Sequence, residues 1–213
     1  MSPILALDCE TAPPVLSPEE MAALKIDRRL KDPAKVEAAR DAAWRKTSLH
    51  PYKARVLCVG FALDDDAPTV TDLPGFAAAL LDLPRRLTVV GHNIDAFDLP
   101  ILWANLWREG SPACRDAARI VGGWLKGKAW DRPTVDTMTA MTLWSPYGKV
   151  APSLDLLCSV LGIPSPKSDI DGSQVLDVWL SGEEGQQRVR DYCARDVEAA
   201  RAVYYHLQMA GRL

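Results

Sequence analysis

The stretch that decides the fold is Ile4-Leu5-Ala6-Leu7-Asp8-Cys9-Glu10-Thr11, near the N-terminus. Its first four residues form an apolar run of strand length, and two acids follow with one residue between them. Side chains two apart in a strand leave the same face, so Asp8 and Glu10 are expected side by side. Two such carboxylates repel, which raises their pKa values unless a cation lies between them. A hard divalent ion would relieve the repulsion, and a polar strand end that caps the next helix would need none.

The rest of the chain alternates between predicted strands and helices. Further apolar or β-branched runs predict strands at 55–63, 69–71, 87–91 and 134–136. Ser17-Pro18 and Asp32-Pro33 each place a capping residue before a proline, which predicts two helix starts. A third helix begins at Ser153 and stops at Gly162, and a last one runs from about 184 to about 209, with a bend or break near its middle. This order predicts an α/β fold with a mixed sheet.

Residues 12–54 form a helical, charge-rich insertion between the first two predicted strands. Its Lys, Arg, Asp and Glu residues are either a solvated face or part of a rim that guides a strand of substrate. No internal repeat, low-complexity tract or linker is visible, so we expect one domain over residues 1–213.

The composition excludes several classes of protein. The chain has 213 residues, of which 48% are hydrophobic and 25% charged, as in an ordinary globular domain. No apolar run approaches the about 20 residues of a membrane span, and no basic segment precedes the first strand, so we expect no membrane contact and no signal peptide. The net charge of −3 argues against a protein that coats duplex DNA, but not against an enzyme that grips a chain end.

Cysteine and histidine usage indicates which metals could bind. The five cysteines are scattered without a CxxC pair, which argues against a disulfide framework and a structural zinc site. With three histidines in the chain, a metal would be held mainly by oxygen, which favours Mg²⁺ or Mn²⁺. A reducing cytoplasm is the expected compartment.

Two later segments supply further acids. Asp98 ends the stretch Gly91-His92-Asn93-Ile94-Asp95-Ala96-Phe97-Asp98, which follows a predicted strand and opens an apolar helix. It could be an ordinary helix cap or part of a site. Tyr192 and Asp196 are four residues apart in the last helix and share one face. Asp196 is either an acid that needs a cation beside the sheet or a solvent-facing residue beside Arg195.

Taken in this order and context, the acids Asp8, Glu10, Asp98 and Asp196 resemble those of the DEDD superfamily of 3′-5′ exonucleases. This DnaQ-like superfamily has a ribonuclease H-like fold, and its motifs are a DxE, an HN-x-x-x-FD segment and a Tyr-x-x-x-Asp. Tyr192 matches the tyrosine variant (DEDDy). The resemblance extends over nearly the whole chain and implies a mixed five-stranded sheet flanked by helices, with the helical insertion between strands 1 and 2.

Further segments look like one branch of that superfamily, the branch related to the exonuclease domain of family B DNA polymerases, which includes stand-alone bacterial and phage proteins. They are Val135-Asp136-Thr137-Met138, Pro152-Ser153-Leu154-Asp155, Leu161-Gly162-Ile163-Pro164, Lys167 with Asp171-Gly172, and Trp179-Leu180-Ser181-Gly182. Cys9 departs from the pattern, because a larger apolar residue is common inside the DxE. We expect this departure to leave metal binding unaffected.

The resemblance implies a two-ion active site. One Mg²⁺ or Mn²⁺ ion would be held by Asp8, Glu10 and Asp196, and a second, about 4 Å away, by Asp8 directly and by Asp98 largely through water. Tyr192 would orient the attacking water, since a phenol is a poor base. The products would be nucleoside 5′-monophosphates released from the 3′ end of single-stranded DNA or of frayed ends.

Three residues are predicted to bind substrate, each with an alternative. Thr11 would meet the terminal nucleotide or simply start the next turn, and Asn93 would contact substrate or brace its loop. Phe97 would stack on a terminal base or pack in the core. His92 is expected to be structural, and Lys167 either touches a phosphate or is solvated.

Alternative functions stay open at this point. The same chemistry could act on RNA, because no residue visibly reads a 2′-hydroxyl group. A catalytically inactive domain could bind nucleic acid or a polymerase, although the intact acids and Tyr192 argue against it. Roles in DNA repair or proofreading fit the branch, with a separate polymerase or repair protein as a candidate partner.

Overall fold

A five-stranded mixed sheet forms the centre of the computed structural model, which describes residues 2–146, 148–166 and 170–211. The strand order is β3-β2-β1-β4-β5, and β1 runs antiparallel to β2 and parallel to β4. The bounds are Ile4–Ala12 for β1, Arg55–Leu63 for β2, Thr69–Thr71 for β3, Thr88–Gly91 for β4 and Thr134–Asp136 for β5. The predicted mixed sheet is confirmed.

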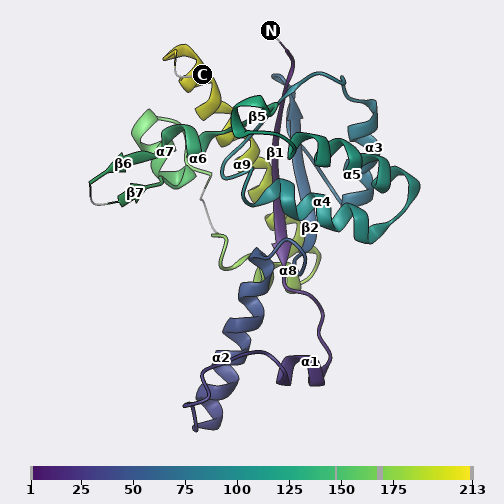
Figure 1. The fold of residues 1–213 in the computed structure, drawn as a ribbon, viewed down its shortest axis with the longest axis vertical. Helices are drawn as coiled ribbons and strands as arrows, with labels where there is room; N and C mark the ends of the chain where they lie inside the picture. Colours follow the sequence, from purple (N-terminus) through teal and green to yellow (C-terminus); the bar gives the residue numbers. More distant parts are fainter. Residues whose placement is uncertain (1, 147, 167–169, 212–213) are drawn as a thin grey trace.

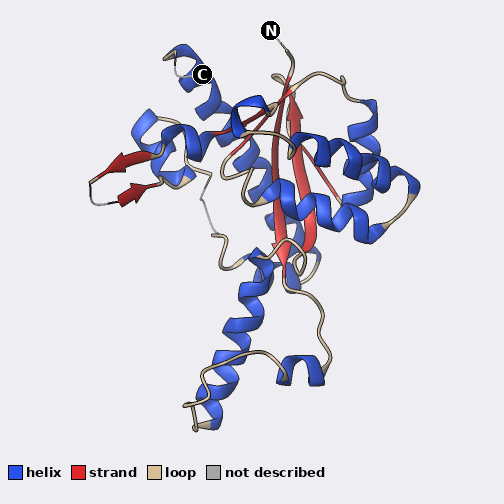
Figure 2. Ribbon diagram, in the orientation of Figure 1, coloured by secondary structure: helices blue, strands red, loops and turns tan. Residues whose placement is uncertain are grey.

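Helices cover both faces of this sheet (Figures 1 and 2). One layer contains α3 (Leu73–Asp82), α4 (Asp98–Glu109) and α5 (Pro112–Trp124). The other face carries α9 (Glu183–Met209). Along β1 the side chains alternate between the layers, so that Leu5 and Leu7 enter the core under α3–α5 while Ala6 packs against α9. Asp8 and Glu10 follow Ala6 at a spacing of two and therefore lie on the α9 side.

Helix α9 is continuous over 27 residues, so a break near its middle is wrong, and a bend there stays a prediction. Apolar residues such as Val189, Val197 and Val203 are buried along its whole length. Burial of this stripe against the sheet keeps the helix continuous through its charged middle segment, because tertiary packing outweighs local propensity.

A small residue on β2 allows α9 to lie close to the sheet. Gly60 pairs with Asp8 across the β1–β2 ladder. A Cβ atom on Gly60 would lie 2.8 Å from Cys193 Sγ and 3.0 Å from Val197 Cγ2, both on α9. A side chain there would push the helix away from Asp8, so Gly60 sets the separation between the two elements.

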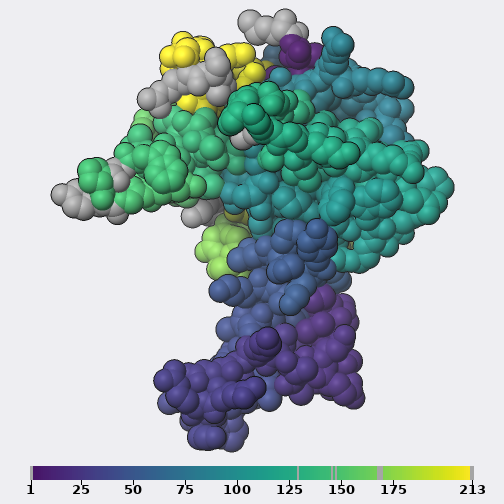
Figure 3. Space-filling view, in the orientation of Figure 1, coloured from purple at the N-terminus to yellow at the C-terminus, as the bar shows by residue number. Residues whose placement is uncertain are grey.

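Between β1 and β2 the chain forms an arm, residues 13–54, that projects from the body (Figure 3). It contains α1 (Pro18–Ala22), α2 (Pro33–Arg45) and the 3₁₀ turn η1 (Lys46–Leu49). Ser17 and Asp32 cap α1 and α2 as predicted. Neither helix buries a residue, so the predicted helical insertion contributes little to the core.

The segment between β5 and α9 carries the smaller elements. These are α6 (Thr137–Met141), β6 (Leu143–Ser145), β7 (Gly148–Val150), α7 (Leu154–Leu161) and α8 (Val175–Leu180), with η2 (Ala129–Asp131) just before β5. The β6–β7 ribbon is separate from the main sheet and was not predicted. Helix α7 starts after Ser153 and ends at Gly162, as predicted. Within the described part of the chain, no helix is both long and apolar enough to cross a membrane.

Substituting Gly60→Ala should destabilise the protein by about 1–3 kcal/mol, because the new methyl group overpacks the α9 contact. Urea denaturation measures the change. The matched control is Gly123→Ala in α5, where a Cβ atom would have nothing within 4 Å and should stabilise the helix by up to about 1 kcal/mol. Equal effects of the two substitutions would contradict a close-approach role for Gly60.

Candidate active site

Asp8 and Glu10 lie on the second half of β1, on its α9 face. They sit beyond the short ladder with β4, which pairs only with residues 4–6 of β1. Among the described strands, none pairs with this part of β1 on its β4 side. Glu10 is 8% exposed, and Asp8 is half-buried at the wall of a cleft.

Asp98 reaches this region from the opposite helical layer. It is the first residue of α4, and its Oδ1 accepts a hydrogen bond of 3.0 Å from the backbone N–H of Cys9. The helix has no side-chain cap, because Phe97 occupies the N-cap position. The helix-cap alternative for Asp98 is therefore wrong: its carboxylate bonds to β1, at a residue 89 positions away.

Tyr192 and Asp196 approach from α9 and share its inner face, as their spacing predicted. Both line a cleft of about 280 Å³ together with Asp8, His92 and Asn93. Tyr192 is 8% exposed, and its hydroxyl makes a hydrogen bond to the Asp196 carboxylate. The solvent-facing alternative for Asp196 does not hold, because its side chain faces the cleft that Asp8 lines.

The acids of the site have raised pKa values, because they are buried and repel one another. Burial raises the pKa of Asp8, and the charge of Asp98 raises it further. Burial also raises the pKa of Glu10, with added repulsion from Asp8 and Asp196. For Asp98, burial raises the pKa to about 7 although hydrogen bonds from Cys9 lower it in part. A cluster of carboxylates with raised pKa values is an arrangement that a divalent cation would stabilise.

The same buried and negatively charged surroundings affect the pKa of Tyr192. Burial raises the pKa of its phenol, and the negative charges of Asp196 and Glu10 raise it further. The group therefore stays protonated at neutral pH and can donate a hydrogen bond to Asp196.

The structure adds two cysteines that sequence reasoning did not assign to the site. Cys193 Sγ lies 3.5 Å from Asp8 Oδ2, and the ligand atoms of Asp8, Glu10 and Cys193 all lie within 4.8 Å of one another. Cys9 donates its backbone N–H and its thiol to Asp98. A cysteine inside the DxE thus has a specific contact with Asp98, and no local pattern would have shown it. All five cysteines are free thiols and buried.

Asn93 occupies a strained loop that is held by Asp136. Its φ of 61° lies in the left-handed region, which asparagine tolerates better than most residues. Asp136 Oδ1 accepts the backbone N–H of Asn93 and also caps α6 through Met138 and Thr139. Asp136 is thus both the cap of α6 and the brace of the loop that leads to Asp98.

The remaining predicted residues lie around this centre. The hydroxyl of Thr11 donates to the carbonyl of Ser48 and so ties the arm to the end of β1. Phe97 packs partly into the main core. His92 Nδ1 is 3.0 Å from the hydroxyl of Thr137, a structural contact. Lys167 lies outside the described residues. Substrate contacts by Thr11, Asn93 and Phe97 stay predictions.

Comparison with known proteins places the chain in a family. Residues 84–213, more than half of the chain, match the family of predicted 3′-5′ exonucleases related to the exonuclease domain of PolB. The chain belongs to this family. The match includes Asp98, Tyr192 and Asp196, and Asp8 and Glu10 precede it.

Among solved structures, the chain is similar to the family B DNA polymerase from the hyperthermophilic archaeon Pyrobaculum calidifontis, with a TM-score of 0.60 and 16% sequence identity. The similarity covers 98% of this chain and 25% of that polymerase, so the chain spans about a quarter of its length. The fold is therefore the ribonuclease H-like fold of a family B polymerase exonuclease. A search of curated proteins gave no match.

The raised pKa values predict how the metal-free protein responds to pH. A folded-state pKa above the unfolded-state value means that protonation stabilises the folded state. The free energy of unfolding in EDTA should therefore rise as the pH falls from about 7, the pKa of Asp98, towards about 4, the unfolded-state value. Urea titrations across this range measure it, and constant or falling stability would contradict the account.

Asp98→Asn should stabilise the metal-free protein above neutral pH, on the order of 2 kcal/mol. The amide oxygen can still accept the Cys9 N–H, whereas the buried charge is gone. The same urea titrations should show a weaker pH dependence than in the wild type. A lower free energy of unfolding in this variant would show that the charge of Asp98 does not destabilise the folded state.

Proposed function

We propose that the chain is a metal-dependent 3′-5′ exonuclease that releases nucleoside 5′-monophosphates from the 3′ end of single-stranded DNA. The observation that carries this proposal is the convergence of three distant segments: β1 brings Asp8 and Glu10, the start of α4 brings Asp98, and α9 brings Tyr192 and Asp196. This is the arrangement that the tyrosine variant of the DEDD exonucleases requires.

The donor set fits hard divalent cations. Four carboxylates share a confined site in which three of them have raised pKa values, and oxygen donors suit Mg²⁺ or Mn²⁺. Asp8, Glu10 and Asp196 would hold one ion, and Asp8 and Asp98 a second. Two such ions supply activation of a water molecule and neutralisation of the charge that develops on the phosphate.

Tyr192 positions the water and does not remove its proton. Its phenol is protonated and donates to Asp196, so a lone pair of its oxygen is left to accept a hydrogen bond from water. The attacking water releases a proton to solvent as its oxygen forms a bond to phosphorus and the bond from phosphorus to the 3′-oxygen breaks. The leaving 3′-oxygen takes up a proton from solvent, so the protons balance, and the terminal nucleotide departs with its 5′-phosphate.

The preference for DNA rests on the relatives. The family is described as related to the exonuclease domain of PolB, and the similar structure is a DNA polymerase. A cleft of about 280 Å³ is close to the size of a site for one small ligand, which suits a terminal nucleotide of a single strand or a frayed end better than a duplex. A separate polymerase or repair protein is proposed as a partner.

A labelled-oligonucleotide assay tests the proposal. A 5′-labelled deoxythymidine oligomer should shorten in single-nucleotide steps with Mg²⁺ or Mn²⁺ and stay intact in EDTA. Shortening that survives EDTA would refute the metal-dependent mechanism. Faster loss of a matched uridine oligomer would assign the enzyme to RNA.

Two substitutions on α9 should separate positioning from metal binding. Asp196→Asn should lower kcat by about a thousandfold or more, because a proposed ion ligand is lost. Tyr192→Phe should lower kcat by about ten- to a hundredfold with little change in KM, since its hydroxyl only orients water. Asp191→Asn is the matched control on the same helix: it is exposed, bonds to Gln187, and should leave kcat unchanged. Equal losses in Asp191→Asn and Asp196→Asn would contradict the site assignment.

A further inference from the structure

The arm differs in charge from the rest of the molecule. Residues 13–54 contain nine Lys and Arg against six Asp and Glu, a formal charge of +3, so the rest of the chain carries −6. An acidic protein that gathers positive charge on one projecting element has a local site for polyanions. Because α1 and α2 bury no residue, packing of the hydrophobic core does not explain why the chain has this arm.

The acids of the arm are largely engaged within it. Glu19 and Glu20 bond to Ser17, and Asp32 caps α2. Asp27 pairs with Arg29, and Asp41 pairs with Arg45, which also reaches Asp177 on α8. In contrast, Lys31, Lys35 and Lys46 are exposed, and within the described part of the chain they form no ion pair. Their charges are available to a ligand.

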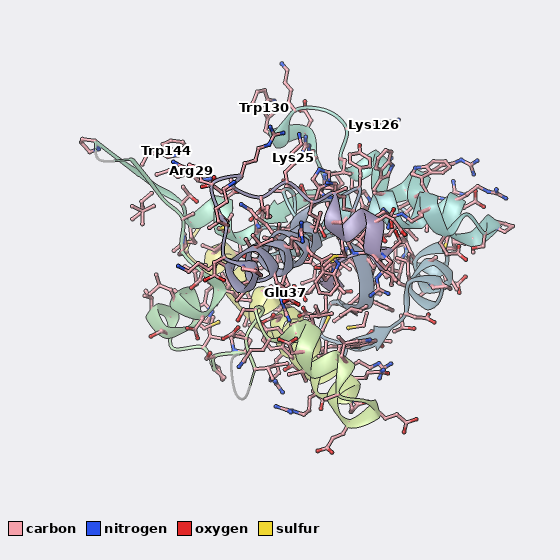
Figure 4. The ribbon with its side chains drawn as sticks, turned by 90° about the horizontal axis from the view of Figure 1, so that it is seen from below. Lys25, Arg29, Glu37, Lys126, Trp130 and Trp144 are labelled. Carbon is pink, nitrogen blue, oxygen red and sulfur yellow. The ribbon has the colours of Figure 1, made fainter. Side chains whose placement is uncertain are left out.

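Two of these lysines lie near one line: Lys35 is in α2, and Lys46 is its C-cap, the first residue of η1, with helical backbone angles. Lys35 and Lys46 are 11 residues apart, which is close to three full turns, so they share a face about 16 Å in length. Glu37 lies about 200° around the helix from Lys35, on the far side. Seen along the arm from below, Lys25 and Arg29 also extend on the side away from Glu37 (Figure 4). Lys25 and the pair Lys35 and Lys46 therefore lie away from Glu37, whereas Arg29 is paired with Asp27.

A groove lies beside Lys46, where the arm meets the end of β1. It has a volume of about 530 Å³ and is lined by Thr11, Lys46, Ser48, Leu49 and Gly172, among others. Thr11 is three residues beyond Asp8 on the same strand, about 10 Å away. Leu49 is 60% exposed and offers an apolar surface next to the cation. Positive charge with apolar surface suits a strand whose bases are unpaired.

We propose that this groove and the lysine row of the arm bind the single-stranded nucleic acid upstream of the 3′ end that enters the site. The direction in which the nucleic acid lies, with its 3′ end in the site, rests on the proposed function. Lys46 would contact a phosphate close to the terminal nucleotide, and Lys35 one further upstream. Oligonucleotides too short to reach the arm should then lack this contribution to binding.

The test compares oligonucleotides of two lengths, deoxythymidine oligomers of about 20 and about 3 nucleotides, with the double variant Lys35→Glu/Lys46→Glu. KM for the long oligomer should rise about tenfold, and its dependence on salt should weaken by about 1.4 in log–log slope, for two lost phosphate contacts. KM for the short oligomer and kcat for both should stay within about twofold of wild type, since the acids of the site are untouched.

The matched control is Arg85→Glu/Arg86→Glu, which changes charge equally in the exposed loop before β4, at the opposite end of the sheet. It should behave as wild type. An unchanged KM for the long oligomer in the arm variant, or an equal rise for the short oligomer, overturns the proposal.

Fluorescence anisotropy of the labelled long oligomer in EDTA measures binding without cleavage, so this test does not depend on catalytic activity. If the wild type cuts neither oligomer, the proposed function fails, and the arm is judged by binding alone. About tenfold weaker binding by Lys35→Glu/Lys46→Glu, with no change in the arginine control, would support the arm as a nucleic-acid surface. Equal binding by all three proteins would overturn it.

Discussion

The structure depends on one electrostatic constraint: several carboxylates are held close together, in largely buried positions, around the half of β1 that β4 does not pair with. Exclusion of water and mutual repulsion both raise their pKa values, so the metal-free arrangement costs stability. The packed elements around them supply the free energy that keeps the acids in place. Such strain is common where a protein gives up stability for function.

Three features of the fold impose this closeness. Strand β4 pairs only with the first part of β1, which leaves the side of Asp8 and Glu10 open to α4. Gly60 lets α9 approach, and the backbone of Cys9 fixes Asp98. The arm leaves the body just beyond these acids, where Thr11 bonds to Ser48. Sheet order, one glycine and one backbone hydrogen bond thus convert separate motifs into a single site.

The sequence predicted those strand bounds and helix caps that depend on residues close together in the chain. The strands at 55–63, 69–71 and 134–136 were predictable to the residue, because β-branched runs end there at turn-forming residues. The caps at Ser17, Asp32 and Ser153 followed from short-range hydrogen bonding. The β6–β7 ribbon has strands of three residues, with Leu143, Trp144 and all of β7 exposed, and so short a strand leaves no pattern. The bond from Cys9 to Asp98 and the contact of Cys193 with Asp8 arise from tertiary packing alone.

The central claim is that Asp8 is the centre of one shared cation site. The most direct test counts bound Mn²⁺ ions by titration calorimetry. The account predicts two ions for each wild-type chain and loss of both in Asp8→Asn, because both depend on this carboxylate. Asp155→Asn, which changes an acid on the wall of the same cleft that is not a proposed ligand, should keep both ions. Full binding by Asp8→Asn, or equal losses in the two variants, would contradict it.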